Sequence, residues 1–339
     1  MQCSELNILM PIRISTTVQG SRYALLSAGL HEVRCCCLAS RTLLAAASAC
    51  VDYSFKFGAP RYICIYVCSN VSRFFYYPHL IRAVPRKSSA LSDQFSIMSL
   101  HGQSAFITGG AKNLGALVAS QLAAEGANVA IHYHGASSTE AADSLVADLR
   151  QRYPEIKVQA YQADLVPAAN VKQIFSDILK DFGKLDIVVN TVGMVLKKPL
   201  AEISEQEYDN MFAVNSKSAF FIAQEAAKAV SDGGKIINIV TALLAAYTPF
   251  YSAYQGSKAP VEWFTKGLSK ELMSRRVSVN AIAPGPMDTP FFYAQETEDS
   301  IAYLKSGALD GRLTKITDIA PIVKFLVSEG QWITGKHMR

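Results

Sequence analysis

The sequence predicts an α/β protein with a doubly wound parallel sheet, formed by a single domain that follows a long N-terminal segment. From Met98 onward, short apolar runs rich in β-branched residues alternate with longer stretches of helical period. Helices of this length between consecutive strands require right-handed crossovers, which cover both faces of a parallel sheet. Ligands of such sheets bind beyond the carboxyl ends of the strands, so the residues after each strand are the functional candidates.

The expected elements follow one another regularly along the second part of the chain. Strands are expected at 104–108, 128–133, 157–161, 185–190, 235–240 and 277–281. Helices are expected at 114–125, 139–152, 171–182, 205–230 and 253–273. The first helix is followed by Gly126, a residue typical of helix ends.

Composition divides the chain into two unlike parts, with the boundary between Ser88 and Met98. All seven cysteines lie in residues 1–97, which hold ten Lys and Arg against four Asp and Glu. Residues 98–339 hold 23 basic and 24 acidic residues and no cysteine, so the overall charge of +5 belongs to the first part. The second part therefore gives no electrostatic reason to expect a nucleic-acid partner.

Residues 1–97 show no sustained period, and their longest apolar stretch, 42–51, is about half the length that spans a bilayer. Three interpretations remain open: an upstream extension without a folded role, a targeting segment, or a small ordered appendage. A transit peptide fits the Arg-rich, Ser-rich and acid-poor composition better than a secretory signal does. We expect no membrane span and a cytoplasmic protein, with mitochondrial targeting as the alternative.

A glycine-rich turn, Thr108 to Gly115, joins the first strand to the first helix. Its glycines would let backbone N–H groups approach a pyrophosphate at the positive end of that helix. The second strand ends in the run 132–138, which contains no acidic residue to bind a ribose hydroxyl. Together with Lys112, the hydroxyls of Ser137 and Ser138 would suit a 2′-phosphate, which favours NADP(H) over NAD. A simple helix-capping role for these serines is compatible with that function.

The pair Tyr254 and Lys258 lies four residues apart on an expected helix, so both side chains share one face. A nearby ammonium favours the phenolate and is expected to lower the pKa of Tyr254. Thr241, thirteen residues before Tyr254, ends the preceding strand and could bond to a substrate carbonyl oxygen. The Tyr–Lys spacing alone is a weak signal, and its position after this strand gives it weight.

At this point the chain resembles the short-chain dehydrogenase/reductase family over about residues 100–335, which implies a Rossmann fold. The motifs occur in the family's order: Thr108, Gly109 and Gly115; Asp164; 190–193; Asn215; Thr241, Tyr254 and Lys258; Pro284, Gly285 and Thr289. The resemblance implies catalytic roles for Thr241, Tyr254, Lys258 and Asn215, the last supporting a proton relay. The cofactor-binding candidates are Gly109, Lys112, Asn113, Leu114, Gly115, His134, Ser137, Ser138, Asp164, Asn190, Gly193, Tyr254, Lys258, Pro284, Gly285, Met287 and Thr289.

The chain departs from the family pattern at four places. Asn113 replaces a glycine of the turn, and Asn tolerates left-handed backbone better than most residues. Residues 190–193 read Asn-Thr-Val-Gly where the family has a second Asn and Ala, and Thr241 replaces a Ser. The chain ends at Arg339, soon after Gly335, so we expect a truncated last strand and weakened contacts between subunits.

These features predict an NADP-dependent ketoreductase that acts on an apolar small molecule of secondary metabolism, as a homodimer or homotetramer. A catalytically impaired NADP-binding scaffold and an NAD-dependent alcohol dehydrogenase remain the alternatives. No metal is expected, because residues 98–339 have no cysteine and only four histidines. His132 is expected to be structural or to lie at the cofactor's edge. Candidate pocket residues are Tyr247, Phe250, Tyr251, Met287, Phe291, Phe292, Tyr293, Ile301 and Tyr303, although they could equally pack a lid or an interface.

Overall fold

The computed structural model describes residues 51–57, 61–67, 100–246 and 248–339. The chain divides into two units, 1–87 and 88–339, and each is described by itself. In the first unit, β1 (Val51–Phe57) and β2 (Arg61–Val67) pair antiparallel, where the sequence showed no strand pattern. Met98 and Tyr247 lie outside the described residues.

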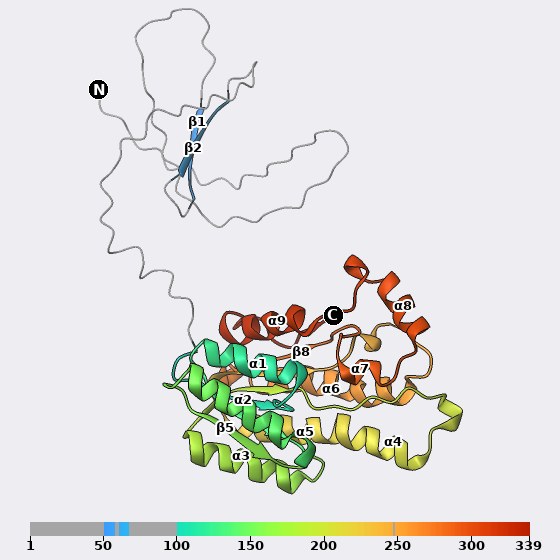
Figure 1. Ribbon diagram of the computed structural model, residues 1–339. Helices are drawn as coiled ribbons and strands as arrows, with labels where there is room; N and C mark the ends of the chain where they lie inside the picture. Colours follow the sequence, from blue (N-terminus) through green and yellow to red (C-terminus); the bar gives the residue numbers. More distant parts are fainter. Residues whose placement is uncertain (1–50, 58–60, 68–99, 247) are drawn as a thin grey trace, which may run out of the picture. The chain divides into compact units, whose positions relative to one another are not determined.

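The second unit is built on a seven-stranded parallel sheet in the order β5-β4-β3-β6-β7-β8-β9 (Figure 1). Its strands are β3 (Ser104–Thr108), β4 (Asn128–Tyr133), β5 (Val158–Gln162), β6 (Leu185–Asn190), β7 (Val230–Ile239), β8 (Ser278–Ile282) and β9 (His337–Met338). The predicted doubly wound parallel sheet is therefore confirmed.

The sheet edge next to β8 is formed by a short last strand, β9. β9 has two residues, and His337 and Met338 pair in parallel with Ala281 and Ile282 of β8. The strand expected to be truncated is thus present in short form. The Gly335 N–H also bonds to the Val279 carbonyl at 2.8 Å, which extends the attachment beyond the strand itself.

Helices cover both faces of the sheet. Since alternate strand residues point to opposite sides, each face has its own apolar core. On one face, Ala105 and Ile107 pack with the buried residues of α1 (Asn113–Ala124), α2 (Thr139–Arg152) and α9 (Ile316–Ser328). On the other face, Phe106 and Val188 pack with α3 (Ala168–Phe182), α5 (Ser218–Ala229) and the end of α6 (Ser252–Glu271).

The helix predicted over 205–230 is interrupted in the structure. It consists of α4 (Glu205–Phe212), a π-helical turn (Ala213–Lys217) and α5, and Val230 already belongs to β7. Turns of this kind are frequent at functional sites, and this one contains Asn215. Two further helices, α7 (Pro290–Tyr293) and α8 (Glu298–Ser306), follow β8 (Figure 1).

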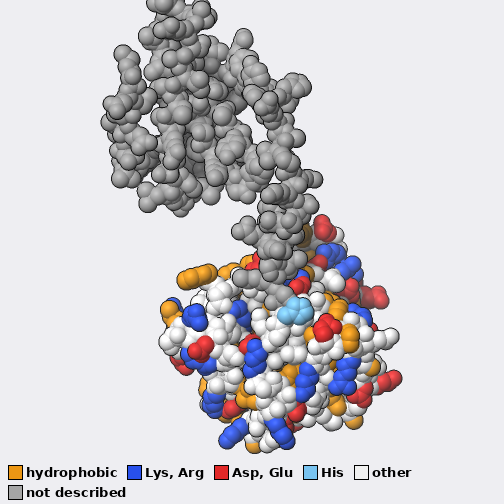
Figure 2. Space-filling view, turned by 90° about the vertical axis from the view of Figure 1, so that its left-hand side faces the viewer, with side chains coloured by type: hydrophobic (Ala, Val, Ile, Leu, Met, Phe, Trp, Pro, Cys, Tyr) orange, Lys and Arg blue, Asp and Glu red, His pale blue; other side chains and the backbone are white. Residues whose placement is uncertain are grey.

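Charges of both signs are interspersed on the face of the second unit shown in Figure 2, and neither sign forms a continuous field. This agrees with the near-neutral composition of residues 98–339. Within the described ranges, none of the helices is sufficiently long and apolar to cross a membrane.

Candidate active site

The strand order reverses between β3 and β6, and a row of buried polar side chains marks this point. Thr108 Oγ1 donates to Asn190 Oδ1 at 2.8 Å, and Asn190 Nδ2 lies 3.4 Å from Asn238 Oδ1. Asn238 Nδ2 donates to Thr265 Oγ1 at 3.0 Å, which ties the row to α6. Asn238 and Thr265 were not among the predicted residues. The signal that could have found Asn238 is a single polar residue inside an apolar strand.

The glycine-rich turn after β3 has the shape that an approaching phosphate requires. Gly109 has φ +62°, and Asn113 has φ +50°, which confirms the left-handed backbone expected at that Asn. A Cβ on Gly115 would lie 2.3 Å from the carbonyl oxygen of Gly109, so only glycine fits there. Lys112 precedes α1 without capping its first N–H groups. The turn therefore fits the pyrophosphate of a dinucleotide.

Leu114 contributes to this turn through its backbone alone, because its side chain is buried in the core below. A cofactor contact at Leu114 stays a prediction, and the burial of the side chain leaves only the backbone available for it.

The polar residues predicted at the far end of the cofactor site gather beside this turn. Lys112 Nζ donates to the carbonyl of Ser137 at 2.9 Å, so the two loops meet. His134 Nδ1 lies 3.9 Å from Asp164 Oδ1, and both side chains are exposed. Ser138 stands at the N-cap of α2, yet its side chain makes no capping bond. Lys112 is thereby placed where it could meet a 2′-phosphate.

His132 connects the glycine-rich turn to the loop after β5. Its Nδ1 accepts from the Gly109 N–H at 3.1 Å, and its Nε2 lies 2.9 Å from the Ala163 carbonyl, which can only accept. These partners fix the neutral tautomer with hydrogen on Nε2. Burial lowers the pKa of His132 to about 4, although the bond to Ala163 opposes this.

We expect the stability of the protein to decrease as the pH falls from about 6.5 to about 4. The unfolded chain protonates His132 near pH 6.5 and the folded chain only near 4, so acid favours unfolding by roughly 3 kcal/mol across this range. Urea titrations between pH 4 and 7 would measure the free energy of unfolding as a function of pH. In His132→Gln, which lacks the titrating group, this part of the pH dependence should disappear. An unchanged slope would contradict the assignment.

The side chains predicted to be catalytic come together at the carboxyl end of β7. Tyr254 and Lys258 lie one turn apart on α6, and Thr241 follows β7, where its hydroxyl lowers the pKa of the Tyr254 phenol. Thr241 Oγ1 also accepts from the Leu243 N–H at 3.3 Å, which orients the hydroxyl. All three side chains are buried.

The charge states in this cluster differ from the expectation. Burial raises the pKa of Tyr254, and the hydroxyl of Thr241, rather than Lys258, is the group that lowers it. Burial also lowers the pKa of Lys258 to about 8. The Lys258 ammonium lies 3.3 Å from the carbonyls of Val192 and Ile239, so two backbone groups hold it.

Asn215 braces the loop that follows β6. Its Oδ1 accepts from the Met194 N–H at 2.8 Å, and its Nδ2 donates to the Met194 carbonyl at 2.9 Å. Ser257 Oγ, on α6, lies 2.9 Å from the same Nδ2. A Cβ on Gly193 would lie 2.7 Å from Lys258 Nζ and 3.1 Å from Asn215 Oδ1. Gly193 thus leaves room beside both functional groups.

The segment after β8 closes the site from the other side. The Ala242 N–H donates to the Pro284 carbonyl at 2.9 Å, which joins this segment to the loop of Thr241. Gly285 follows, and a Cβ there would meet only Thr314 Oγ1, at 3.7 Å. Met287 forms a bridge with Thr314, and Thr289 is buried at the N-cap of α7.

Of the aromatic pocket candidates, Tyr251 packs with Tyr254 of the catalytic cluster. Its ring is buried, and its centroid is 6.1 Å from that of Tyr254. Phe250, Phe291, Tyr293 and Tyr303 are between 39% and 77% exposed, so a pocket role for them has no support from burial.

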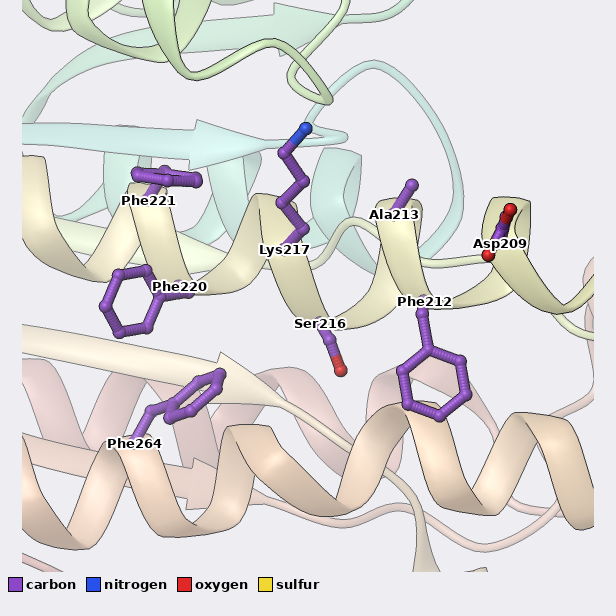
Figure 3. A pocket seen from close by; sticks show the side chains of 8 residues that line it. All are labelled: Asp209, Phe212, Ala213, Ser216, Lys217, Phe220, Phe221 and Phe264. Carbon is purple, nitrogen blue, oxygen red and sulfur yellow. The ribbon is translucent and has the colours of Figure 1, made fainter.

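A separate apolar groove of about 530 Å³ lies between the α4–α5 region and α6 (Figure 3). Phe220 and Phe264, which both line it, contact each other edge to face with ring centroids 5.2 Å apart. Its other lining residues are Asp209, Phe212, Ala213, Ser216, Lys217 and Phe221. None of these was predicted as a site residue.

Comparison with known proteins identifies the family. A family model described as enoyl-(acyl carrier protein) reductase matches residues 109–339. A short-chain type dehydrogenase/reductase of Picea abies is 38% identical over 71% of this chain and 91% of its own. Elsinochrome reductase 1 of Elsinoe fawcettii is 31% identical over 71% of this chain and 94% of its own.

A solved dehydrogenase structure from Burkholderia cenocepacia, with bound NADP, is 49% identical. It covers 73% of this chain and 95% of its own, with a TM-score of 0.68. The fold, the order of the strand-end motifs and these similarities agree, and the chain belongs to the short-chain dehydrogenase/reductase family.

Proposed function

We propose that residues 98–339 form an NADP(H)-dependent reductase that converts the carbonyl group of an apolar small molecule to a secondary alcohol. The observation that carries this proposal is the shared burial of Thr241, Tyr254 and Lys258 at the carboxyl end of β7, with Gly193 beside the Lys258 ammonium. The relative named as a reductase of elsinochrome supports a role in secondary metabolism.

The side chains divide the work according to their positions. Thr241 would bond to the substrate oxygen and hold it against Tyr254, whose raised pKa keeps the phenol protonated and able to donate. Lys258 and the residues of the glycine-rich turn would hold the cofactor, and Asn215 keeps the loop of Gly193 in place. When bound, NADPH supplies the hydride.

The proposal is tested with the full-length protein, NADPH and a panel of cyclic and aromatic ketones. Oxidation of NADPH that requires both a ketone and the Tyr254 hydroxyl would support a reductase. Binding of NADPH without any such turnover would instead favour a cofactor-binding scaffold. Faster turnover with NADH would favour the NAD-dependent alternative.

Replacing Lys112 with Ala is expected to weaken NADPH binding roughly three- to tenfold and to leave NADH binding unchanged. The exposed ammonium would pair with the 2′-phosphate, which NADH lacks, and solvent limits the strength of that pair. Fluorescence titration of both cofactors measures the effect. Lys172→Ala, at an exposed position on α3, is the matched control. Equal losses for both cofactors would refute the assignment.

We further propose that the protein assembles as a homodimer or homotetramer, with a second copy covering the apolar groove between α5 and α6. Phe220 is 43% exposed in this groove, and Trp263 on α6 is 68% exposed. Exposed apolar clusters of this kind are typical of interfaces. Sedimentation velocity should give a multiple of the chain mass, and Phe220→Glu should shift it toward the monomer. A monomeric wild-type protein would contradict the proposal.

A further inference from the structure

The buried carboxylate of Glu296 connects three segments close to the catalytic cluster. The side chain of Glu296, between α7 and α8, is only 2% exposed. It pairs with the ammonium of Lys197 at 2.5 Å and accepts hydrogen bonds from the hydroxyls of Tyr251 and Ser300. Lys197 belongs to the loop after β6, and Tyr251 directly precedes α6. Glu296 therefore connects the α7–α8 segment to both of these loops.

Backbone contacts strengthen the same junction. The Lys197 N–H donates to the side-chain oxygen of Gln295 at 3.0 Å, and the Lys198 N–H donates to the Phe250 carbonyl at 2.7 Å. Phe250 has φ +71°, a conformation that is unfavourable for a bulky residue and that the surrounding contacts must maintain. The three segments thus form one connected structure around Tyr251.

This junction lies close to the reacting groups. The Lys197 ammonium is 5.8 Å from the centre of the Tyr251 ring, which is 6.1 Å from the centre of the Tyr254 ring. Lys197 Nζ is therefore no more than about 12 Å from the Tyr254 ring. The apolar side chains packed with Tyr251 and Tyr254 include Met194, Val195, Leu196, Ile203, Met211 and Leu243.

Both lysines at this junction are already paired with carboxylates of the protein. Lys197 is paired with Glu296, and Lys198 lies 2.9 Å from both carboxylate oxygens of Glu207. Neither ammonium is left to bind a substrate carboxylate. Although burial opposes it, bonds from Lys197, Ser300 and Tyr251 keep the pKa of Glu296 below its usual value, so the carboxylate stays charged at neutral pH.

We propose that Glu296 is a specificity-determining residue, which makes the site select uncharged ketones over ketones that carry a carboxylate. Glu296 neutralises Lys197 and holds the α7–α8 segment in place. This inference rests on the proposed reductase function and specifies its substrate class. A protein can discriminate against an unwanted ligand by withholding the charge that would bind it.

The experiment compares two ketones of the same skeleton, a keto ester and the keto acid formed by its hydrolysis, as substrates of the full-length protein with NADPH. Wild type should have the higher kcat/KM for the ester. In Glu296→Gln, the uncompensated Lys197 should raise kcat/KM for the acid relative to the ester at least about tenfold. This is the effect expected near a protein surface for unit charges about 12 Å apart, the upper limit of the distance from Lys197 Nζ to the Tyr254 ring. Hydrogen exchange of residues 290–306 should also become faster.

Three further variants make the test specific. Lys197→Gln leaves Glu296 unpaired and should shift the ratio in the opposite direction, against the acid. The double variant Lys197→Gln/Glu296→Gln is neutral again and should return to the wild-type ratio. Glu298→Gln, at an exposed position two residues away, should change neither the ratio nor the exchange.

The outcomes separate the two proposals. Wild type that reduces the ester, combined with an unchanged ratio in Glu296→Gln, overturns the role of Glu296 and leaves the reductase function standing. If Glu296→Gln does not fold, the opposite shift in Lys197→Gln decides the question, and no shift there overturns the inference. Wild type that reduces neither compound nor any other ketone overturns the reductase function, and this inference with it.

Discussion

Tyr254→Phe is expected to lower ketone turnover by about 10²- to 10⁴-fold, the usual contribution of a positioned proton donor. The substitution removes the hydroxyl that Thr241 contacts and keeps the ring that packs with Tyr251. Burial raises the pKa of this phenol, so at neutral pH it carries the proton that an alcohol product requires. The measurement is kcat with saturating NADPH, together with the NADPH dissociation constant, which should change less than tenfold.

Two comparisons separate proton donation from general damage to the fold. Tyr161 lies on β5, at the edge of the sheet away from β7, and its partly buried phenol bonds to Asp181. Tyr161→Phe removes this phenol, and turnover should remain unchanged. Thr241→Val removes the hydroxyl that orients the substrate oxygen and should reduce turnover as well. If Tyr254→Phe retains wild-type turnover, the proposed mechanism is wrong.

The strand-end residues could be predicted because parallel strands bring their carboxyl ends to one edge of a sheet. The strand pattern placed Thr108, Asn190 and Thr241 at or just after strand ends, and the left-handed backbone of Asn113 was expected because Asn there replaces a glycine of the family's turn. These features depend on local sequence and on topology, both of which a single chain reveals.

The pKa shifts of Tyr254 and Lys258 and the contacts of Glu296 with Lys197 could not be predicted. The effect of Lys258 on Tyr254 depends on where its ammonium points, and two backbone carbonyls distant in sequence decide that. Likewise, Glu296 and Lys197 are 99 residues apart and belong to irregular segments, for which no periodicity gives a register. The π-helical turn at Asn215 also escaped notice, because its five residues resemble ordinary helix in sequence.

Gly115→Ala is expected to weaken NADPH binding by roughly 5- to 150-fold, which corresponds to the 1–3 kcal/mol typical of overpacking. A Cβ at this position would lie 2.3 Å from the Gly109 carbonyl oxygen and 3.0 Å from the Gly110 Cα. Backbone atoms cannot swing aside as a flexible side chain can, so the turn must separate from α1. The affinity measured by titration should therefore decrease, and kcat at saturating NADPH should decrease less.

Gly267→Ala is the matched control, because Gly267 lies within α6 and a Cβ there would meet nothing within 4 Å. Alanine at such a helical position removes the entropic cost of glycine, so this variant should bind NADPH normally and melt slightly higher. Thermal melts of both variants without cofactor distinguish local from global effects. A Gly115→Ala protein that folds and binds NADPH within twofold of wild type would show that the turn does not hold the pyrophosphate.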